Sequence, residues 1–246
     1  MSPTIIAGVR FLVSVTDLVE AADAAGAGAE IIDVKDPGAG SLGEAPPERV
    51  QAIRDIVPSH LPVSAALGDG PFEAHTVTRA AVLLSACGAK YVKVGLRNTN
   101  RRMALDMLRA IRGGLPPDCG LIAVGFADFE LARCLDPAEL PALTAAAGAD
   151  GCLVDTLVKD GRGLLSWLDD AALSALVADC RARGLLCGLA GSLKAGDLPR
   201  IAAIRPDIVG VRGAACIGDR VSGRVSAERV AALARLLHDP VAARAQ

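Results

Sequence analysis

The chain has 246 residues, of which 52% are apolar, and its formal net charge is −2. That length fits one α/β barrel better than two ordinary domains, and the apolar content is enough for a large core. Dispersed Lys and Arg residues argue against a nucleic-acid surface, and with only 2% aromatic residues there are few platforms for stacking bases. No apolar run approaches the roughly 20 residues of a membrane span. We therefore expect neither nucleic acid nor a membrane as a partner.

The N-terminal residues and the cysteines indicate the cellular compartment of the protein. Residues 1–10 lack the basic start, long apolar middle and small-residue cleavage site of a signal peptide. Seven cysteines, an odd number without a C-x-x-C pair, are typical of reduced thiols. These features predict a cytoplasmic protein. The sequence leaves open whether the chain forms a homo-oligomer.

Eight short, β-branched runs alternate with segments of helical spacing. The predicted strands are Phe11–Val15, Ile31–Asp36, Pro62–Leu67, Tyr91–Leu96, Leu121–Ala127, Cys152–Leu157, Leu186–Ser192 and Ile208–Gly213. The predicted helices include Leu18–Ala25, Val77–Ala86, Met103–Ile111, Ala138–Ala146, Ala171–Arg183 and Ala227–Leu237. This alternation implies parallel strands joined by right-handed crossovers.

An open, doubly wound sheet would alternate in the same way. Eight units, with no Gly-rich dinucleotide fingerprint after the first strand, favour a closed barrel instead. No Ser/Gly-rich linker divides the chain. The sequence therefore predicts an α/β fold, a (β/α)₈ TIM barrel, as a single domain over residues 1–246 with the barrel proper at about residues 11–238.

An internal repeat supports this prediction. A Gly-Ala pair precedes three of the strands, with Gly28, Gly88 and Gly148 at an interval of 60 residues (88 − 28 and 148 − 88). Residues 205–207 look like a fourth, shortened copy. A glycine that closes the preceding helix explains each copy. The even interval indicates a barrel built of four two-unit quarters.

Charged residues stand in these strands where a buried parallel strand normally carries Val or Ile. Side chains alternate between the faces of a strand, and inward side chains of alternate barrel strands share layers. We therefore expect five charged residues to converge inside the mouth: Asp33, Lys35, Lys93, Asp155 and Arg212. Burying one unpaired charge is costly, so the group must be mutually paired or poised on a substrate.

Several of these charges also have a structural explanation. Asp33 could form an ion pair with the lysine of its own strand that only closes the barrel. Asp155 could cap the turn that follows its strand, and Arg212 could bridge Asp207 or Asp219. The sequence alone does not choose between these roles and a functional one.

Two lysines in one mouth point to carbonyl chemistry. A lysine amine with a pKa of about 10.4 is mostly protonated at neutral pH. Desolvation or a nearby cation lowers that pKa and frees the amine to attack a carbonyl, and Lys35 and Lys93 could act on each other in this way. Asp33 or Asp155 could then move protons through the imine and enamine stages.

The three histidines lie outside every predicted strand, at His60, His75 and His238. Neither a zinc site nor a Ser-His-Asp triad therefore has a plausible set of residues. We expect no metal and no cofactor.

Small residues end the seventh and eighth predicted strands. Gly191 and Ser192 follow the seventh, and Gly213 and Ala214 follow the eighth. Small residues let backbone N–H groups reach a phosphate, and these two loops commonly bind phosphate in such barrels. They could also be ordinary turns. The loop 38–43 is a further candidate for a second phosphate site or a lid.

Five motifs follow one another at the strand ends. They are Asp33-Val-Lys-Asp-Pro37 with Gly40-Ser-Leu-Gly43, Tyr91-Val-Lys-Val-Gly-Leu96, Leu153-Val-Asp-Thr156 with Lys159-Asp-Gly161, Leu189-Ala-Gly-Ser192, and Val209-Gly-Val-Arg-Gly-Ala-Ala-Cys216. Together they resemble the (5-formylfuran-3-yl)methyl phosphate synthase family, from about Phe11 to Val230. The sequence departs from the family pattern at Asp36, in residues 70–75 and in residues 216–220.

The resemblance implies a class I aldolase-like barrel and a carbon–oxygen lyase acting on phosphates. The family condenses two molecules of glyceraldehyde 3-phosphate, with release of one phosphate and water, during biosynthesis of methanofuran or a methanofuran-like one-carbon cofactor. By the same resemblance Lys35 forms the Schiff base and Lys93 is the acid–base lysine, supported by Asp33, Asp155 and Lys159. Two alternatives remain open: another Schiff-base aldolase acting on a phosphorylated aldehyde or ketose, and a non-catalytic barrel that binds a phosphorylated metabolite.

Overall fold

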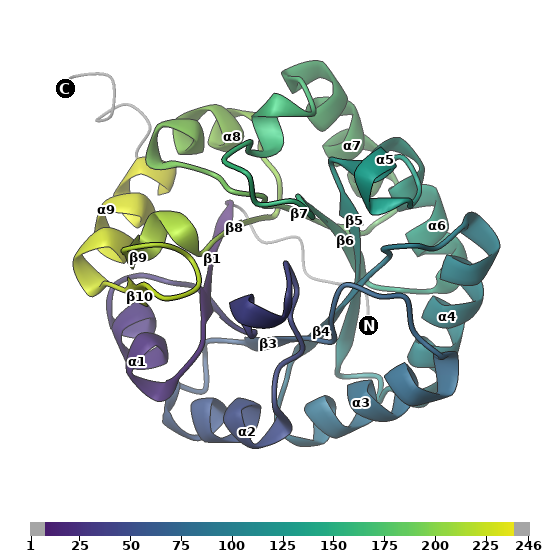
Figure 1. The fold of residues 1–246 in the computed structure, drawn as a ribbon, viewed down its shortest axis with the longest axis horizontal. Coiled ribbons are helices and arrows are strands. Elements are labelled where there is room, and N and C mark those ends of the chain that lie inside the picture. Colours follow the sequence, from purple (N-terminus) through teal and green to yellow (C-terminus); the bar gives the residue numbers. More distant parts are fainter. Residues whose placement is uncertain (1–7, 239–246) are drawn as a thin grey trace.

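Eight parallel strands close into a barrel in the computed structural model, which describes residues 8–238 (Figure 1). The strands are β1 (Arg10–Val15), β2 (Ile31–Val34), β3 (Val63–Ala66), β4 (Tyr91–Gly95), β5 (Gly120–Phe126), β6 (Gly151–Asp155), β7 (Leu186–Leu189) and β8 (Ile208–Val211). Each strand pairs in parallel with the next in the chain, and β8 pairs with β1. The predicted (β/α)₈ barrel is confirmed. Residues 1–7, which include most of the segment used to judge a signal peptide, lie outside the described residues.

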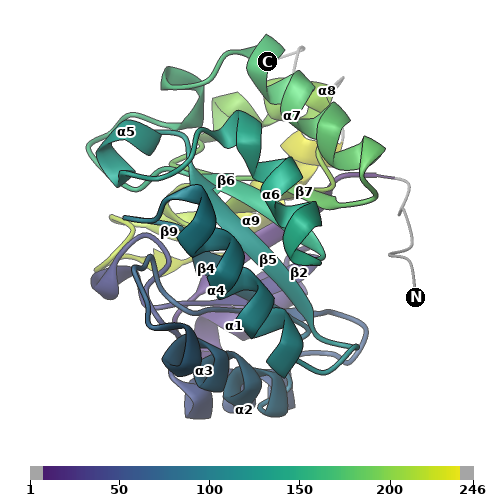
Figure 2. The same ribbon diagram turned by 90° about the vertical axis from the view of Figure 1, so that its right-hand side faces the viewer.

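Helices surround the barrel on its outer side (Figures 1 and 2). They are α1 (Leu18–Gly26), α2 (Pro47–Ile56), α3 (Ala74–Ala86), α4 (Arg101–Gly114), α5 (Phe129–Ala132), α6 (Leu140–Ala147), α7 (Asp170–Ala182), α8 (Leu198–Ile204) and α9 (Ala227–His238). A two-stranded hairpin of β9 (Cys216–Ile217) and β10 (Arg224–Val225) follows β8. None of the helices within residues 8–238 has the length and apolar character that a bilayer crossing requires.

The main core lies between the strands and the helices, where the outward strand side chains meet the helix faces. Inside the barrel, Leu12, Ile31 and Ile208 pack together at one level. A second inner group includes Ile122, Val124 and Phe126 of β5. These apolar layers fill the barrel, so it is a packed core with access only at its ends.

The three glycines of the repeat have the positive φ that was predicted for residues that end a helix. Gly28, Gly88 and Gly148 have φ values of 106°, 91° and 71°, each at the end of a helix. In the fourth copy Arg205 takes the left-handed position with φ 59°. The repeat therefore marks the entry into each even-numbered strand.

The predicted strands start within one residue of the observed ones, and all except the first, which ends correctly at Val15, run too far at their ends. The run predicted as Ile31–Asp36 pairs only as far as Val34, and the run predicted as Leu186–Ser192 only as far as Leu189. The residues beyond these points leave the sheet and turn over the mouth. The residues that were wrongly predicted as strand therefore belong to the segments that line the candidate site.

Candidate active site

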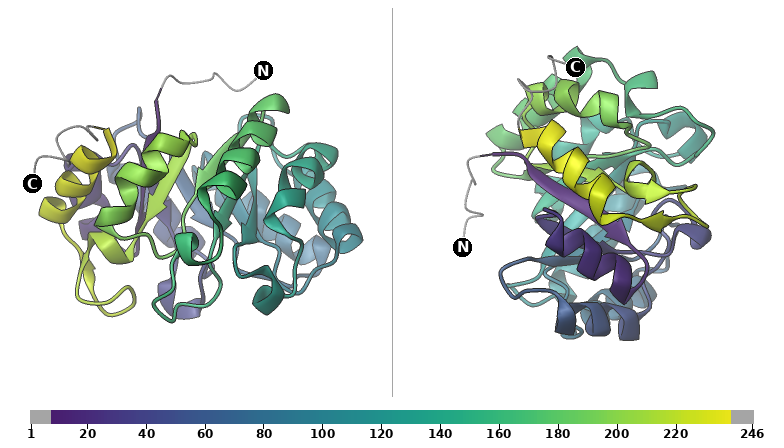
Figure 3. Two further views of the ribbon diagram at one scale, coloured as in Figure 1. Left: turned by 90° about the horizontal axis from the view of Figure 1, so that it is seen from above. Right: turned by 90° about the vertical axis from the view of Figure 1, so that its left-hand side faces the viewer.

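A cavity of about 400 Å³ opens at the end of the barrel that is formed by the C-terminal ends of the strands. The segments after β2, β7 and β8 project from this same end (Figure 3). Residues of β1, β4, β6 and β8, of the segments after β2, β6, β7 and β8, and of α9 line it: Leu12, Ser14, Lys35, Lys93, Leu153, Asp155, Lys159, Ala190, Gly191, Ser192, Leu193, Lys194, Ala195, Gly210, Val211, Arg212, Gly213, Ala214, Arg220 and Arg229. Ligand sites of this fold lie at this end of the barrel. We call this space the mouth cavity.

Asp33 and Lys93 form a buried ion pair at the floor of the mouth cavity. The Nζ of Lys93 lies 2.6 Å from Oδ1 of Asp33, and the two side chains are 5% and 0% exposed. Ser64 donates to Oδ1 of Asp33 at 2.5 Å, and Ser14 donates to Oδ2 at 2.8 Å. Ser64 is the β3 partner of Asp33 in the sheet, so register places this hydroxyl beside the carboxylate. The ion pair considered between Asp33 and Lys35 is therefore wrong, because Asp33 pairs with Lys93 of β4, on the far side of β3.

Lys35 lies just beyond the end of β2 without a carboxylate in contact among the described residues. Its Nζ donates to the carbonyl oxygen of Ser41 at 3.1 Å. Burial lowers the pKa of Lys35 to about 8; Asp155 opposes this shift and Lys93 adds to it. A lysine with this pKa carries a useful fraction of neutral amine near physiological pH.

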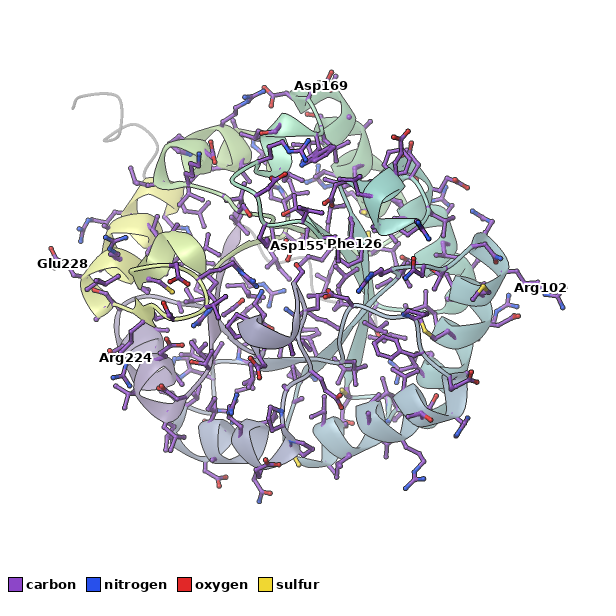
Figure 4. The ribbon with its side chains drawn as sticks, in the orientation of Figure 1. Arg102, Phe126, Asp155, Asp169, Arg224 and Glu228 are labelled. Atoms are coloured by element: carbon purple, nitrogen blue, oxygen red, sulfur yellow. The ribbon has the colours of Figure 1, made fainter. Side chains whose placement is uncertain are left out.

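Asp155 ends β6 and points toward the centre of the barrel, whereas Arg102, Asp169 and Glu228 lie at the outer rim (Figure 4). Its Oδ1 accepts from Lys159 Nζ at 2.7 Å and from the N–H of Thr156, also at 2.7 Å. Burial acts to raise the pKa of Asp155, but the charges of Lys159 and Lys35 outweigh it and lower the pKa to about 2. The backbone contact fits the capping role considered for Asp155, and the contact with Lys159 adds a second.

Two aspartates that sequence reasoning did not single out hold the loops of the site. Asp69, after β3, accepts from the N–H groups of Ser41 and Leu42 at 2.9 Å each. Asp128, after β5, accepts from the N–H groups that follow Thr156, at 2.7 and 2.8 Å. Each aspartate thus fixes the loop of a neighbouring strand, one beside Lys35 and the other beside Lys159. Neither belongs to a motif that would have marked it.

The loop 38–43, considered as a lid, is held in place over the mouth. Gly40 has φ 133°, and a side chain there would collide with the carboxylate of Asp69. Ser41 Oγ donates to the carbonyl oxygen of Thr156 at 2.9 Å, joining this loop to the end of β6. Figure 1 shows the segment after β2 folded across the middle of the ring.

The small residues after β7 and β8 form another part of the lining of the mouth cavity. Gly191 has φ 106°, and a Cβ there would lie 2.9 Å from the backbone nitrogen of Thr156, so only glycine fits. Ser192 also has a positive φ, 49°. In the part of the chain that the structure describes, the N–H groups of Gly191 and Ser192 have no hydrogen-bond acceptor. Gly213 and Ala214 begin the turn after β8 and line the same space.

Arg212 lines the cavity, but its guanidinium is already engaged. It donates to Glu20 at 2.9 and 3.4 Å, and to the carbonyl oxygens of Ser14 at 3.0 Å and Arg220 at 2.7 Å. Burial acts to raise the pKa of Glu20, but hydrogen bonds from Arg212 and the backbone hold it below its ordinary value. The bridge to Asp207 or Asp219 considered above is wrong, since Glu20 of α1 is the partner. Nothing in the amphipathic pattern of α1 distinguished Glu20 from a surface acid.

Positive charge dominates the mouth cavity. Among the described residues that line it, seven are lysine or arginine, and Asp155 supplies the one carboxylate. Three of these cations were missed from the sequence: Arg220, in the β9–β10 hairpin, Lys194, after β7, and Arg229, in α9. Such an excess of positive charge attracts and holds anionic ligands.

The fold and this site define a (β/α)₈-barrel enzyme with a cationic mouth. The family model for 4-HFC-P synthase matches residues 11–234. The (5-formylfuran-3-yl)methyl phosphate synthase of Methanococcus maripaludis is 40% identical over 234 residues, covering 93% of this chain and 99% of the relative. That of Methanocaldococcus jannaschii is 40% identical over 231 residues, covering 92% and 98%. The chain belongs to the 4-HFC-P synthase family, and the resemblance drawn from the strand-end motifs is confirmed.

Solved structures show the same fold at low identity. Phosphoribosyl anthranilate isomerase from Thermotoga maritima superposes with a TM-score of 0.64 at 16% identity, covering 93% of this chain and 98% of that one. 3-Hexulose-6-phosphate synthase from Salmonella typhimurium superposes with a TM-score of 0.61 at 19% identity, covering 94% and 100%. These similarities concern the barrel alone.

Proposed function

We propose that this enzyme condenses two molecules of glyceraldehyde 3-phosphate through a Schiff base on Lys35, giving (5-formylfuran-3-yl)methyl phosphate with release of one phosphate and two molecules of water. The product would serve the biosynthesis of methanofuran or a methanofuran-like one-carbon cofactor. The family membership supports the product. The mechanism is supported by the chemistry of the mouth cavity.

One contrast carries the proposal: the two buried lysines have different surroundings. Lys93 is in an ion pair with Asp33 at 2.6 Å, whereas Lys35 contacts a carbonyl oxygen and has a pKa of about 8. An imine forms when a neutral amine attacks a carbonyl, so Lys35 suits the nucleophile. The ion pair of Lys93 supplies a donor and an acceptor side by side, which suits the acid–base steps.

The charges of Asp155 and Lys159, which line the same cavity as Lys35, fit the same mechanism. Asp155 and Lys159 face the cavity as an ion pair at 2.7 Å. A carboxylate near the imine nitrogen stabilises the positive charge of a protonated imine. We assign Asp155 and Lys159 to this stabilisation and to the proton transfers of the elimination steps.

The rate of imine formation should follow the titration of Lys35. Below a pKa of about 8, each pH unit removes about nine-tenths of the remaining free amine, so the rate should fall about tenfold per unit. We expect borohydride-trapped adduct, measured on the millisecond-to-second scale between about pH 6 and 10, to rise with a midpoint near 8. Because Asp155 raises the pKa of Lys35, Asp155→Asn should move the midpoint to lower pH. An adduct yield that still rises without a plateau at pH 10, as for a lysine with the ordinary pKa of 10.5, would contradict this assignment.

A substrate phosphate should bind the N–H groups beside Gly191, Ser192, Gly213 and Ala214. Replacing Ser192 by Asp places a negative charge against that phosphate, and we expect KM to rise by about 10- to 100-fold. Ser59→Asp is the matched control, because Ser59 is exposed at the other end of the barrel. Unchanged affinity in Ser192→Asp would mean that the phosphate binds elsewhere.

Product identification tests the function as a whole. Purified enzyme is incubated with glyceraldehyde 3-phosphate, and mass spectrometry and a phosphate assay follow the reaction. We expect a furan aldehyde phosphate and inorganic phosphate in equal amounts. A carbon–carbon condensation product without phosphate release would indicate a different Schiff-base aldolase. Absence of any trapped adduct would indicate a barrel that only binds the metabolite.

A further inference from the structure

Arg220 is a cation of the mouth cavity for which the reaction outlined above has no role. Its guanidinium donates to the carbonyl oxygens of Pro37 and Gly40, each at 3.2 Å, and no carboxylate within residues 8–238 forms an ion pair with it. A guanidinium has five N–H groups, so these two contacts leave three available to a ligand. Burial lowers the pKa of Arg220, although the guanidinium stays protonated in proteins.

The side chain of Arg212 holds the main chain of Arg220 in place. Arg212 donates through Nε to the carbonyl oxygen of Arg220 at 2.7 Å, and Glu20 in turn holds Arg212 in an ion pair that is 3% and 2% exposed. Asp219, the preceding residue, accepts from the N–H groups of Val221 and Ser222 at 2.7 and 2.9 Å. The turn that carries Arg220 is therefore rigid, which suits a side chain that must meet a ligand at a set position.

The side chain of Arg220 runs from the β8 side of the mouth cavity to the segment after β2. A Cβ added at Gly213 would lie 3.7 Å from the Cβ of Arg220, so the side chain starts on the β8 side. Its guanidinium ends at Pro37 and Gly40, on the β2 side, next to the loop that contacts Lys35. The free N–H groups of Gly191 and Ser192 lie on the β7 side instead. The cavity thus offers two kinds of contact to an anion, the backbone N–H groups after β7 and this guanidinium.

We propose that Arg220 binds the phosphate of the second aldehyde phosphate, and so selects a phosphorylated molecule as the partner that condenses with the Lys35 adduct. This rests on the proposed function. With the phosphate of the first molecule at the N–H groups after β7 and β8 and its carbonyl carbon on Lys35, the guanidinium beside Pro37 and Gly40 is left for the second molecule. The planar fork of Arg220 matches a phosphate there. The negative charge of that phosphate is balanced by a guanidinium that forms no ion pair with a carboxylate among residues 8–238.

A competition experiment tests the selection directly. Wild-type enzyme and Arg220→Gln are given glyceraldehyde 3-phosphate with an excess of isotope-labelled, unphosphorylated glyceraldehyde. Mass spectrometry then measures the ratio of labelled, mixed products to unlabelled, symmetrical products. Removing a charged hydrogen bond to phosphate should raise that ratio by about 10- to 100-fold. The substrate concentration that half-saturates the borohydride-trapped Lys35 adduct, which reports the first molecule, should change by less than about threefold.

Arg224→Gln is the matched control. Arg224 belongs to the same hairpin but lies at the outside of the barrel beside α1, 3.3 Å from Asp17 (Figure 4). It should leave both the product ratio and the adduct unchanged. Arg220→Lys, which keeps the charge and loses the fork, should give an intermediate ratio, and it keeps the test available if Arg220→Gln does not fold.

The outcomes separate the two proposals. If the product ratio in Arg220→Gln equals that of the wild type, Arg220 does not contact the second molecule. If adduct formation on Lys35 falls in parallel with product, Arg220 only fastens the loop 38–43, and the selection role is wrong. If the wild-type enzyme itself forms no trapped adduct, the proposed function fails, whatever Arg220 does.

Discussion

Lys35→Arg should abolish both turnover and the borohydride-trapped adduct while the barrel stays folded. A guanidinium remains protonated and is a poor nucleophile, so it cannot replace an amine that forms a covalent intermediate. Losing a covalent nucleophile lowers kcat by about four to six orders of magnitude. Steady-state product formation and peptide mapping of the trapped adduct measure the two effects, and thermal unfolding checks the fold.

Lys90→Arg provides the control for this substitution. Lys90 is an exposed lysine that precedes β4, and its Nζ contacts the carbonyl oxygen of Asp118. It lines a separate hollow with Asp118 and His60, away from the mouth cavity. Its replacement should leave turnover unchanged. Trapped substrate found on Lys93 or Lys159 in the wild-type enzyme would show that the nucleophile has been assigned to the wrong lysine.

Lys93→Arg should reduce turnover by about 10²- to 10⁴-fold, the usual contribution of a positioned acid–base group. The ammonium of Lys93 lies 2.6 Å from Asp33, in a site where a larger, permanently protonated group cannot exchange a proton with the substrate. Because Lys35 keeps its amine, some adduct should still form there. Rapid quenching with borohydride, followed by peptide mapping, distinguishes the chemical step from the binding step.

Lys93→Met completes this comparison. It removes the ammonium without the added bulk of arginine, while Ser14 and Ser64 remain as donors to Asp33. Turnover should fall as it does in Lys93→Arg. If Lys93→Met retained wild-type turnover, Lys93 would be a structural partner of Asp33 and the acid–base role would belong elsewhere.

The barrel could be predicted from the sequence because its signals are local. Each strand is a short apolar run, and the glycines of the repeat mark where the even-numbered strands begin. The ends of the strands were harder, since the apolar run continues after pairing has stopped. Lys35 and Gly191 both lie past the last paired residue, so a pattern of hydrophobicity cannot separate them from the sheet.

The charges of the site were predictable and their partners were not. Strand alternation placed Asp33 and Lys93 in one mouth, but their contact depends on the register of β2, β3 and β4, which sequence spacing does not encode. Arg220 lies in a hairpin turn with no repeat or periodicity, and Glu20 lies in a helix where an acid at the first turn is ordinary. Their importance arises only when distant segments meet.

The ion pair between Glu20 and Arg212 also bears on how the chain folds during synthesis. These residues are 192 positions apart, and they join the beginning of the barrel to its last strand. At about 5–20 residues per second, a ribosome makes Arg212 roughly 10 to 40 s after Glu20. During that time β1 lacks its β8 neighbour and presents an unpaired strand edge, which favours wrong pairing and aggregation. The barrel can thus close only late in synthesis. Until β8 emerges from the ribosome, the cell must keep the incomplete barrel from associating with other chains.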